Sequence, residues 1–255
     1  MNVKVMSFNI LCGGDKENWW TKRTGRVVEI IKRYAPDTFG LQEAHYRWMN
    51  VICKALPEYD YVGVGRDNGK RLGEFSPVFY LKDKFEVVDK GNFWLSETPE
   101  VPGKGWDAAC IRICSYAVLK EKATGKTFAH FNTHLDHVGP TAQIEGAKII
   151  ADRGLKYPNI PNVMTGDFNV VPGSEPYNTV VASGFKDTRN IAKSSDESHT
   201  FHNFDRLYHG ELSRSIIDYV FVRNVDKVKS FKVITDKIDG LFPSDHYPVI
   251  ADFDI

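Results

Sequence analysis

The stretch Thr165-Gly166-Asp167-Phe168-Asn169 constrains the fold of this chain more than any other. An apolar approach leads into a glycine, and a carboxylate and a carboxamide then follow two residues apart. Side chains at positions i and i+2 of an extended chain point to the same face. We therefore expect Asp167 and Asn169 to project together from a strand end, while Phe168 points into the core. A strand followed by a polar turn is the alternative, because Asp, Asn and Gly are ordinary turn residues.

Hydrophobic periodicity along the rest of the chain predicts more strands than helices. Helices are predicted over residues 24–34, 48–56, 141–155 and 175–182. Strands are predicted over residues 3–10, 38–43, 59–64, 77–81, 85–93, 111–120, 127–134, 162–165, 216–222, 228–234 and 247–253. Residues 186–214 are polar and turn-rich, so we expect a long loop carrying His199, His202 and His209. Two packed sheets with helices outside would bury this much apolar surface, and we expect a single domain over residues 1–255.

Composition and charge balance limit the classes of function that this chain can have. Apolar residues make up 42% of the chain, enough to build a sizeable core. The 33 Lys and Arg residues balance 33 Asp and Glu residues, so the chain lacks the basic surface of a protein that grips long nucleic acid. The N-terminus has no signal-like apolar core, and no apolar run approaches a membrane span. We expect a cytoplasmic monomer with no membrane partner, in which the four cysteines are reduced thiols and not zinc ligands.

Polar groups of compatible chemistry recur at six predicted strand ends or loops. They are Asn9; Glu43; Asn132 with His134 and Asp136, which share one strand face; Asp167 with Asn169; Asp218; and Asp245 with His246. Taken singly, each is an ordinary turn former, or a packed or solvated histidine. Carboxylates that converge are costly unless a cation neutralises them or one is protonated. Oxygen ligands without cysteine suit Mg²⁺ or Mn²⁺ better than zinc.

Six strings around these positions occur in an order that resembles the endonuclease/exonuclease/phosphatase superfamily, which includes deoxyribonuclease I. They are Ser7-Phe8-Asn9, Gln42-Glu43, Asn132-Thr133-His134, Gly166-Asp167-Phe168-Asn169, Ile217-Asp218-Tyr219 and Ser244-Asp245-His246-Tyr247-Pro248-Val249. The resemblance runs from residue 3 to about residue 253 and is closest to an uncharacterised bacterial branch. It implies an α/β four-layer sandwich, with two mostly antiparallel sheets face to face and helices outside. It also implies metal-dependent phosphoester hydrolysis.

The resemblance also implies a role for each matched residue. Glu43 resembles the principal metal ligand, with Asn9 beside it and Asp245 completing the site. Asp167 and Asn169 resemble the pair that positions the attacking water and binds phosphate. His246, oriented by Asp218, resembles the histidine on the scissile phosphate. The second histidine of the family corresponds to His134, and Glu74, six residues before Tyr80, is its expected carboxylate partner.

Further residues are expected at the substrate. Protonated His246 and His134, with the amides of Asn169 and Asn132, would donate hydrogen bonds to developing charge. Arg112 is either a phosphate clamp or an edge-strand arginine in water, and Asp136 shares the strand face of His134. His199 and His202 flank Phe201 in a loop that is either a substrate-facing lid or solvated. Four tryptophans are candidates to stack a base or sugar, although packing is favoured for the last two: Trp19, Trp20, Trp94 and Trp106.

The leading hypothesis is a Mg²⁺-dependent phosphoesterase, with Mn²⁺ able to substitute. Its substrate would be a phosphodiester or phosphomonoester in a nucleotide, a short nucleic acid or another small phosphoester. One alternative is a phospholipid- or inositol-phosphate-directed hydrolase of the same fold, although no basic amphipathic stretch suggests a membrane surface. The other is a catalytically silent binding module. Duplex DNA repair is disfavoured, because no basic insert that could hold a kinked duplex is identifiable in this neutral chain.

Overall fold

The structure is a computed structural model that describes residues 1–208, 211–225 and 227–255. His209, one of the three histidines expected in the long loop, lies outside the described residues. In the part of the chain that the structure describes, no helix has the length and apolar character needed to cross a membrane.

The first large sheet contains strands from both ends of the chain. Its described strands are β1 (Asn2–Asn9), β2 (Thr38–Gln42), β4 (Tyr59–Val62), β6 (Val78–Leu81), β12 (Ser194–Ser195), β16 (Lys227–Val233) and β17 (Val249–Asp254). They run in the order β12-β16-β17-β1-β2-β6-β4. The pairs β1–β2 and β12–β16 are parallel, and the other described neighbours are antiparallel.

The second large sheet is built from residues 85–223, the middle of the chain. Its described strands are β7 (Phe85–Trp94), β8 (Ile113–Glu121), β9 (Thr127–His134), β10 (Asn162–Asp167), β11 (Lys186–Asp187) and β15 (Asp218–Arg223). They run in the order β11-β15-β10-β9-β8-β7, with β9–β10 parallel and the other described neighbours antiparallel. Two small described sheets pair β3 (Ala44–His45) with β5 (Glu74–Phe75), and β13 (Leu207–Tyr208) with β14 (Glu211–Leu212).

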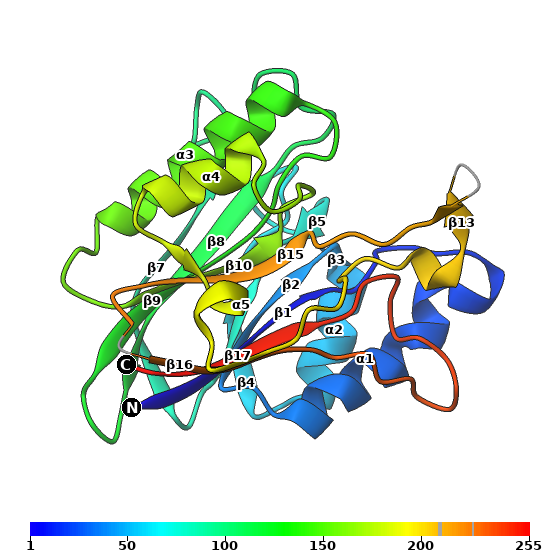
Figure 1. The fold of residues 1–255 in the computed structure, drawn as a ribbon, viewed down its shortest axis with the longest axis horizontal. Helices are drawn as coiled ribbons and strands as arrows, with labels where there is room; N and C mark the ends of the chain where they lie inside the picture. Colours follow the sequence, from blue (N-terminus) through cyan, green and yellow to red (C-terminus); the bar gives the residue numbers. More distant parts are fainter. Residues whose placement is uncertain (209–210, 226) are drawn as a thin grey trace.

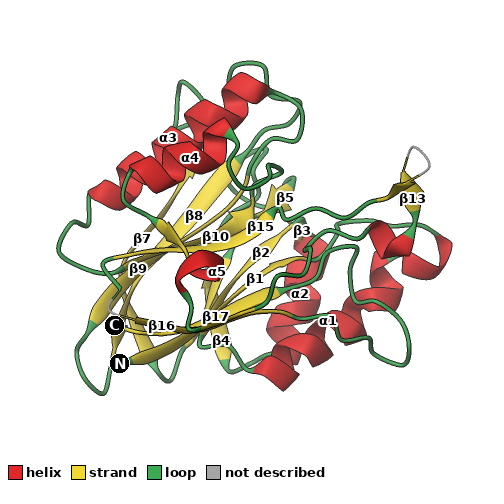
Figure 2. Ribbon diagram, viewed as in Figure 1, coloured by secondary structure: helices red, strands yellow, loops and turns green. Residues whose placement is uncertain are grey.

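Helices cover the outer face of each sheet, as Figures 1 and 2 show. The described helices are α1 (Trp20–Tyr34), α2 (Tyr46–Ala55), α3 (Pro140–Leu155), α4 (Glu175–Ala182), α5 (Thr188–Ile191) and the 3₁₀ turns η1 (Lys16–Asn18) and η2 (Asn203–Asp205). One apolar cluster lies between the sheets and includes Val5, Phe128 and Val220. A second lies between α1, α2 and the first sheet, and a third joins α3 and α4 to the second sheet. The predicted four-layer α/β sandwich is confirmed.

Two sequence expectations differ from the structure. Helix α1 begins at Trp20, four residues before the predicted start, because Trp20 packs against Trp48 and the ring of His45. The stretch 186–214 was expected to be one long loop, but it contains β11, α5, β12 and η2 besides the β13–β14 pair. The short strands β11 and β12 form by pairing with β15 and β16, which are distant in sequence, so the local turn-rich composition gave no sign of them.

Candidate active site

Strand register brings three of the predicted residues side by side. In β10, Asp167 lies opposite His134 of the parallel strand β9 and opposite Asp218 of the antiparallel strand β15. Parallel neighbours end at the same edge of a sheet, and an antiparallel neighbour begins there. Phe168 is fully buried against Tyr219, as the period-2 argument predicted.

A cavity of about 300 Å³ opens at this edge. Both sheets and the loops beside them contribute to its wall. The lining residues are Glu43, Arg66, Glu74, Cys110, Arg112, His134, His137, Asp167, Asn169, Phe201, Asp245 and His246. Eight of these are predicted site residues. The other four predicted site residues are buried and do not line the cavity: Asn9, Asn132, Asp136 and Asp218.

The carboxylate of Asp167 lies at the centre of the site. It is 1% exposed, and its Oδ1 accepts the backbone N–H of Asn169 at 2.9 Å. Its Oδ2 accepts the amide of Asn9 at 2.9 Å and lies 3.4 Å from His134 Nε2 and 3.7 Å from His246 Nε2. Burial raises the pKa of Asp167 to about 7, with the charge of His246 opposing the rise and that of Asp218 adding to it. The group can therefore exchange a proton near neutral pH.

His246 and Asp218 form a buried ion pair. The Nδ1–H of His246 donates to Asp218 Oδ2 at 2.9 Å, and the two side chains are 6% and 1% exposed. Burial alone would lower the pKa of His246, but the carboxylates of Asp218 and Asp167 raise it well above the usual histidine value. The imidazole is therefore held as a cation with Nε2 directed toward Asp167. This pairing is the one that the resemblance implied.

Glu43 is held in an unusual backbone conformation at the end of β2. Its φ of 61° lies in the left-handed region, where a non-glycine residue is strained and which is common at functional sites. The amide of Asn9 donates to Oε1 at 3.0 Å, and the N–H of Cys12 donates to Oε2 at 2.9 Å. Burial would raise the pKa of Glu43, but these donors lower it below its usual value, so the side chain is a carboxylate.

Asn9 differs from the metal ligand that the resemblance implied. Its amide nitrogen faces Glu43 and Asp167 while its oxygen accepts the N–H of Leu11 at 3.0 Å. Asn9 thus fixes two carboxylates relative to each other and does not offer its oxygen to the cavity. Asp245 does line the cavity, and its pKa is raised by burial and by the charge of Glu43, with His246 opposing.

The donor set fits a hard divalent cation. Glu43 and Asp245 are carboxylates whose charges oppose each other in one partly buried cavity, and a cation there would relieve that repulsion. Carboxylate oxygen is the donor that Mg²⁺ and Mn²⁺ prefer. Asp167, Asp218 and His246 also present atoms within 4.8 Å of one another. In that second group, His246 and Asp218 already form an ion pair with each other.

The expected Glu74–His134 pair is not formed. Glu74 Oε2 accepts Arg66 Nη1 at 2.6 Å, whereas His134 Nε2 meets the amide of Asn169 at 3.0 Å. Glu74 reaches the cavity from β5, beside an arginine that sequence reasoning did not connect with it. Burial, together with the positive charge of Arg112, lowers the pKa of His134 well below the usual value. His134 is therefore neutral, in contrast to the protonated donor expected from the sequence.

Arg112 lies in the cavity wall just before β8 and is 5% exposed. Its Nη2 meets His137 Nδ1 at 3.1 Å and its Nε lies 3.5 Å from Asp136. The alternative of an edge-strand arginine in water is therefore wrong, and a phosphate-facing guanidinium stays a proposal.

Two residues expected at the substrate are structural. Asp136 is 1% exposed and accepts hydrogen bonds from four backbone N–H groups, those of Ala109, Cys110, Val138 and Gly139. Burial alone would raise the pKa of Asp136, but these donors lower it below the usual value. Fully buried Asn132 lies between the sheets, donating to the carbonyls of Leu41 and Pro77 and accepting Gln42 Nε2 at 2.7 Å. Because their polar atoms are used in this way, neither side chain is available to a substrate.

The loop before Asp218 contributes an aromatic wall. Phe201 lines the cavity, and its ring lies 4.9 Å from that of His246. His202 is 1% exposed and stacks on Tyr247 at 4.0 Å, so a solvated loop is the wrong description for it. Thr200 Oγ1 accepts the N–H groups of Ile217 and Asp218, which ties this loop to the start of β15.

Comparison with known proteins identifies the family. The profile described as "Endonuclease/Exonuclease/phosphatase family" matches residues 6–246, nearly the whole chain. This chain belongs to the endonuclease/exonuclease/phosphatase family. Members of the family hydrolyse phosphoester bonds, and the chain is an enzyme of this class.

Solved structures of family members cover the whole chain. The endonuclease/exonuclease/phosphatase from Bacteroides vulgatus matches with a TM-score of 0.94 and 39% identity, over 100% of this chain and 99% of that one. A mannosyl-6-phosphatase from Bacteroides thetaiotaomicron VPI-5482 matches with a TM-score of 0.90 and 37% identity, over 98% of each chain. Human nocturnin is 22% identical over 98% of this chain, which spans 65% of nocturnin's length.

Arg23 is a structural residue of the site that sequence reasoning missed. It is fully buried, and it donates to the backbone carbonyls of Ile10, Leu11, Gly13, Asn18 and Pro243. Its guanidinium thus joins the loop after β1, which carries Cys12, to the loop before Asp245. Its position in a basic, amphipathic helix gave no signal, because arginine on such a helix is usually solvated.

We expect Arg23→Lys to lower the free energy of unfolding by about 3–5 kcal/mol, because a lysine cannot reach five carbonyls and leaves several of them buried without a donor. Chemical denaturation measures this. Arg33→Lys on the same helix is the matched control, since Arg33 is largely exposed and a change within about 0.5 kcal/mol is expected. Equal effects of the two substitutions would contradict the structural role of Arg23.

Proposed function

We propose that this protein is a Mg²⁺-dependent phosphoesterase, with Mn²⁺ able to substitute, that hydrolyses a small phosphomonoester. The observation that carries the proposal is one cavity that contains Glu43, Asp245, Asp167 and His246. Two of these residues supply oxygen ligands for a cation, one supplies a carboxylate with a pKa near 7, and one supplies an imidazolium. Phosphoryl transfer depends on positioning and charge stabilisation of this kind.

In the proposed mechanism Asp167 accepts a proton from the attacking water. The N–H of Asn169 and the amide of Asn9 hold its two oxygens, so the carboxylate is fixed in direction. A base works best when its pKa is near the working pH, and such help is worth about 10²–10⁴-fold in rate. Asn169 also fixes the ring of His134 through its amide nitrogen.

His246 donates a hydrogen bond from Nε2 to a phosphate oxygen. Asp218 accepts a hydrogen bond from Nδ1–H, which keeps the ring oriented and charged. Arg112 and Arg66 stand in the same wall, and a guanidinium fork matches phosphate oxygens. Donors aimed at developing charge in a site with little water stabilise the transition state more than they would in solution.

Glu43 and Asp245 would hold the cation. When bound, a divalent cation supplies Lewis-acid polarisation of the phosphate. Asn9 and the N–H of Cys12 keep Glu43 ionised and in place for that role.

A phosphomonoester is the preferred substrate class for two reasons. A relative that is 37% identical over 98% of both chains is named mannosyl-6-phosphatase. The catalytic cavity also shares Arg66 and Glu74 with an adjoining cavity of about 660 Å³, which gives one organic substituent a place beside the phosphate. Hydrolysis of a diester in a nucleotide or short nucleic acid is the competing possibility.

We expect p-nitrophenyl phosphate to be hydrolysed with Mg²⁺ or Mn²⁺, and faster than bis(p-nitrophenyl) phosphate. EDTA is expected to lower the rate by more than about 10²-fold, and restored Mg²⁺ to recover it. Phosphate release, or nitrophenol absorbance for the diester, measures both rates.

Full activity in EDTA would overturn the metal requirement. A faster rate on the diester would replace the phosphatase by a phosphodiesterase. If neither ester is hydrolysed while calorimetry shows Mg²⁺ binding that Glu43→Gln abolishes, the protein is a silent phosphoester-binding module.

We also propose that residues 1–255 act as one domain and as a cytoplasmic monomer. Site residues come from positions as far apart as Asn9 and His246, and all four cysteines are free thiols, which suits a reducing compartment. Light scattering after size-exclusion chromatography tests the oligomeric state.

A further inference from the structure

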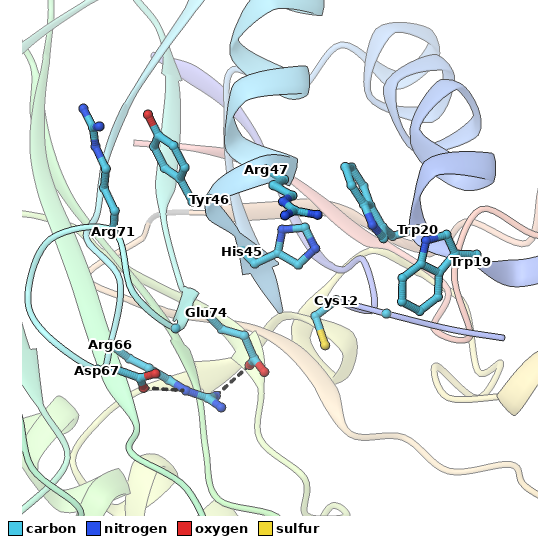
Figure 3. A pocket seen from close by; sticks show the side chains of 12 residues that line it. Cys12, Trp19, Trp20, His45, Tyr46, Arg47, Arg66, Asp67, Arg71 and Glu74 are labelled. Atoms are coloured by element: carbon cyan, nitrogen blue, oxygen red, sulfur yellow. Dashed lines mark hydrogen bonds and ion pairs between the residues drawn. The ribbon is translucent and has the colours of Figure 1, made fainter.

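A second cavity adjoins the catalytic one. It has a volume of about 660 Å³ and shares Arg66 and Glu74 with the catalytic wall. Figure 3 shows it between the loop after β1, the start of α2 and the segment that leads into β5. Its lining residues are Cys12, Gly13, Trp19, Trp20, His45, Tyr46, Arg47, Arg66, Asp67, Arg71, Gly73 and Glu74. A group attached to a phosphate in the catalytic cavity would extend into it past Arg66 and Glu74.

Aromatic side chains form the walls of this second cavity. Trp19 is 48% exposed although it is the largest kind of side chain, and it projects beside the cavity in Figure 3. Trp20 packs on His45 and Trp48, which makes this wall rigid. Tyr46 stands at the opposite side with the guanidinium of Arg71 over its ring at 4.8 Å. Exposed aromatic faces of this kind are typical of ligand-binding clefts.

Charged groups complete the cavity at the catalytic end. Arg66 Nη1 donates to Glu74 at 2.6 Å, and its Nε lies 3.8 Å from Asp67. Figure 3 shows this carboxylate–guanidinium–carboxylate row, and two of its members, Arg66 and Glu74, also line the catalytic cavity. Carboxylates accept hydrogen bonds and a guanidinium donates them, so the row presents both kinds of group within a few ångströms.

We propose that this second cavity binds two sugars of a phosphorylated oligosaccharide. The hydroxyl groups of the sugar that bears the phosphate lie on the Arg66, Asp67 and Glu74 row, and the ring of the next sugar lies against Trp19. The inference rests on the phosphatase function proposed above and names the substrate class. Sugar hydroxyls both donate and accept hydrogen bonds, and this matches the row. The carboxamide side chains that commonly read adenine edges are absent from the twelve residues of the lining.

The second cavity has room for more than one sugar ring. Its volume of about 660 Å³ is more than twice the 300 Å³ or so of the catalytic cavity. A single sugar ring beside the phosphate would fill only part of this space. The sugar that bears the phosphate therefore lies at the Arg66 end, and a second sugar lies between Trp19 and Tyr46.

The test compares Trp19→Ala with wild type on three esters: a mannobiose phosphorylated on its terminal 6-hydroxyl, mannose 6-phosphate and glycerol 3-phosphate. We expect wild-type kcat/KM to be highest for the phosphorylated mannobiose. In Trp19→Ala that value is expected to fall about tenfold, mainly through KM, because a stacking contact is worth roughly 1–1.5 kcal/mol. The value for glycerol 3-phosphate, which has no ring to stack, is expected to be unchanged.

Val88→Ala on β7 is the control, because Val88 is 49% exposed and lies outside the linings of both cavities. Thermal midpoints show that each variant is folded. An equal fall on all three esters in Trp19→Ala would overturn the subsite. Preference for adenosine 5′-monophosphate over both sugar esters, lost in Trp19→Ala, would replace the sugar by a nucleoside.

Direct binding separates this inference from the proposed activity. Calorimetry with unphosphorylated mannobiose is expected to show binding to wild type and much weaker binding to Trp19→Ala. Binding without hydrolysis of any ester would support the subsite and contradict the phosphatase. Hydrolysis of p-nitrophenyl phosphate without any binding of mannobiose would support the phosphatase and overturn the subsite.

Discussion

Asp167→Asn is expected to lower kcat by about 10²–10⁴-fold while the protein stays folded. An asparagine has nearly the same shape and keeps an oxygen for the N–H of Asn169, but it cannot accept a proton from water. Steady-state hydrolysis of p-nitrophenyl phosphate in Mg²⁺ measures the change. Wild-type turnover in a folded variant would remove Asp167 from the role of base.

The same substitution carries a prediction about stability. The folded-state pKa of Asp167 lies above that of an exposed aspartate, because burial disfavours its charge. Ionising it therefore costs stability as pH rises above the unfolded-state value, and asparagine avoids that cost. Asparagine has only one oxygen for the two donors, the N–H of Asn169 and the amide of Asn9, so it loses one hydrogen bond at every pH. We therefore expect the thermal midpoint of Asp167→Asn in EDTA to rise relative to that of wild type as the pH increases from about 5 to about 8. Val163→Ala, from the same strand, is the control and is expected to lower the midpoint, because it leaves a cavity in the core.

Asp218→Asn is expected to lower kcat by about 10²-fold or more through His246, which it orients. A carboxylate accepts a hydrogen bond from the Nδ1–H of the imidazolium and stabilises its charge, whereas an amide oxygen does so weakly. The pKa of His246 is raised in the wild type, so its charge persists to alkaline pH. In the variant that pKa falls, and the alkaline limb of the pH profile is expected to move to lower pH.

The pH profile distinguishes this positioning role from a structural one. A variant that only destabilised the fold would lose activity at all pH values, and the alkaline limb of its pH profile would stay at the same pH. His246→Gln is the matched comparison, and it is expected to abolish the alkaline limb. An unchanged limb in folded Asp218→Asn would contradict the role of Asp218.

The sequence predicted the residue types of the site because a polar residue at the end of an apolar strand can be recognised within a short stretch of sequence. Strand periodicity, with a polar residue where the apolar run stops, placed Asp167, Asp218 and His246 at strand ends or in the loops beside them. Carboxylates of parallel and antiparallel neighbours then meet at one sheet edge, whatever the details of packing. The buried Phe168 followed from the same local pattern, whereas the His246–Asp218 pair was implied by the resemblance to the family.

Only the tertiary structure decided which groups pair with which. Glu74 pairs with Arg66 and not with His134, and Asn132 forms hydrogen bonds from one sheet to the other. These contacts depend on how segments distant in sequence pack together. Arg23 likewise satisfies five carbonyls that the chain brings to it from both of its ends. The cavity beside Trp19 is lined by segments that are distant in sequence, namely the loop after β1, the starts of α1 and α2 and the segment that leads into β5. No pattern within one segment carries that information, since the energy that fixes such contacts comes from packing and from burying polar groups with partners that only the folded chain supplies.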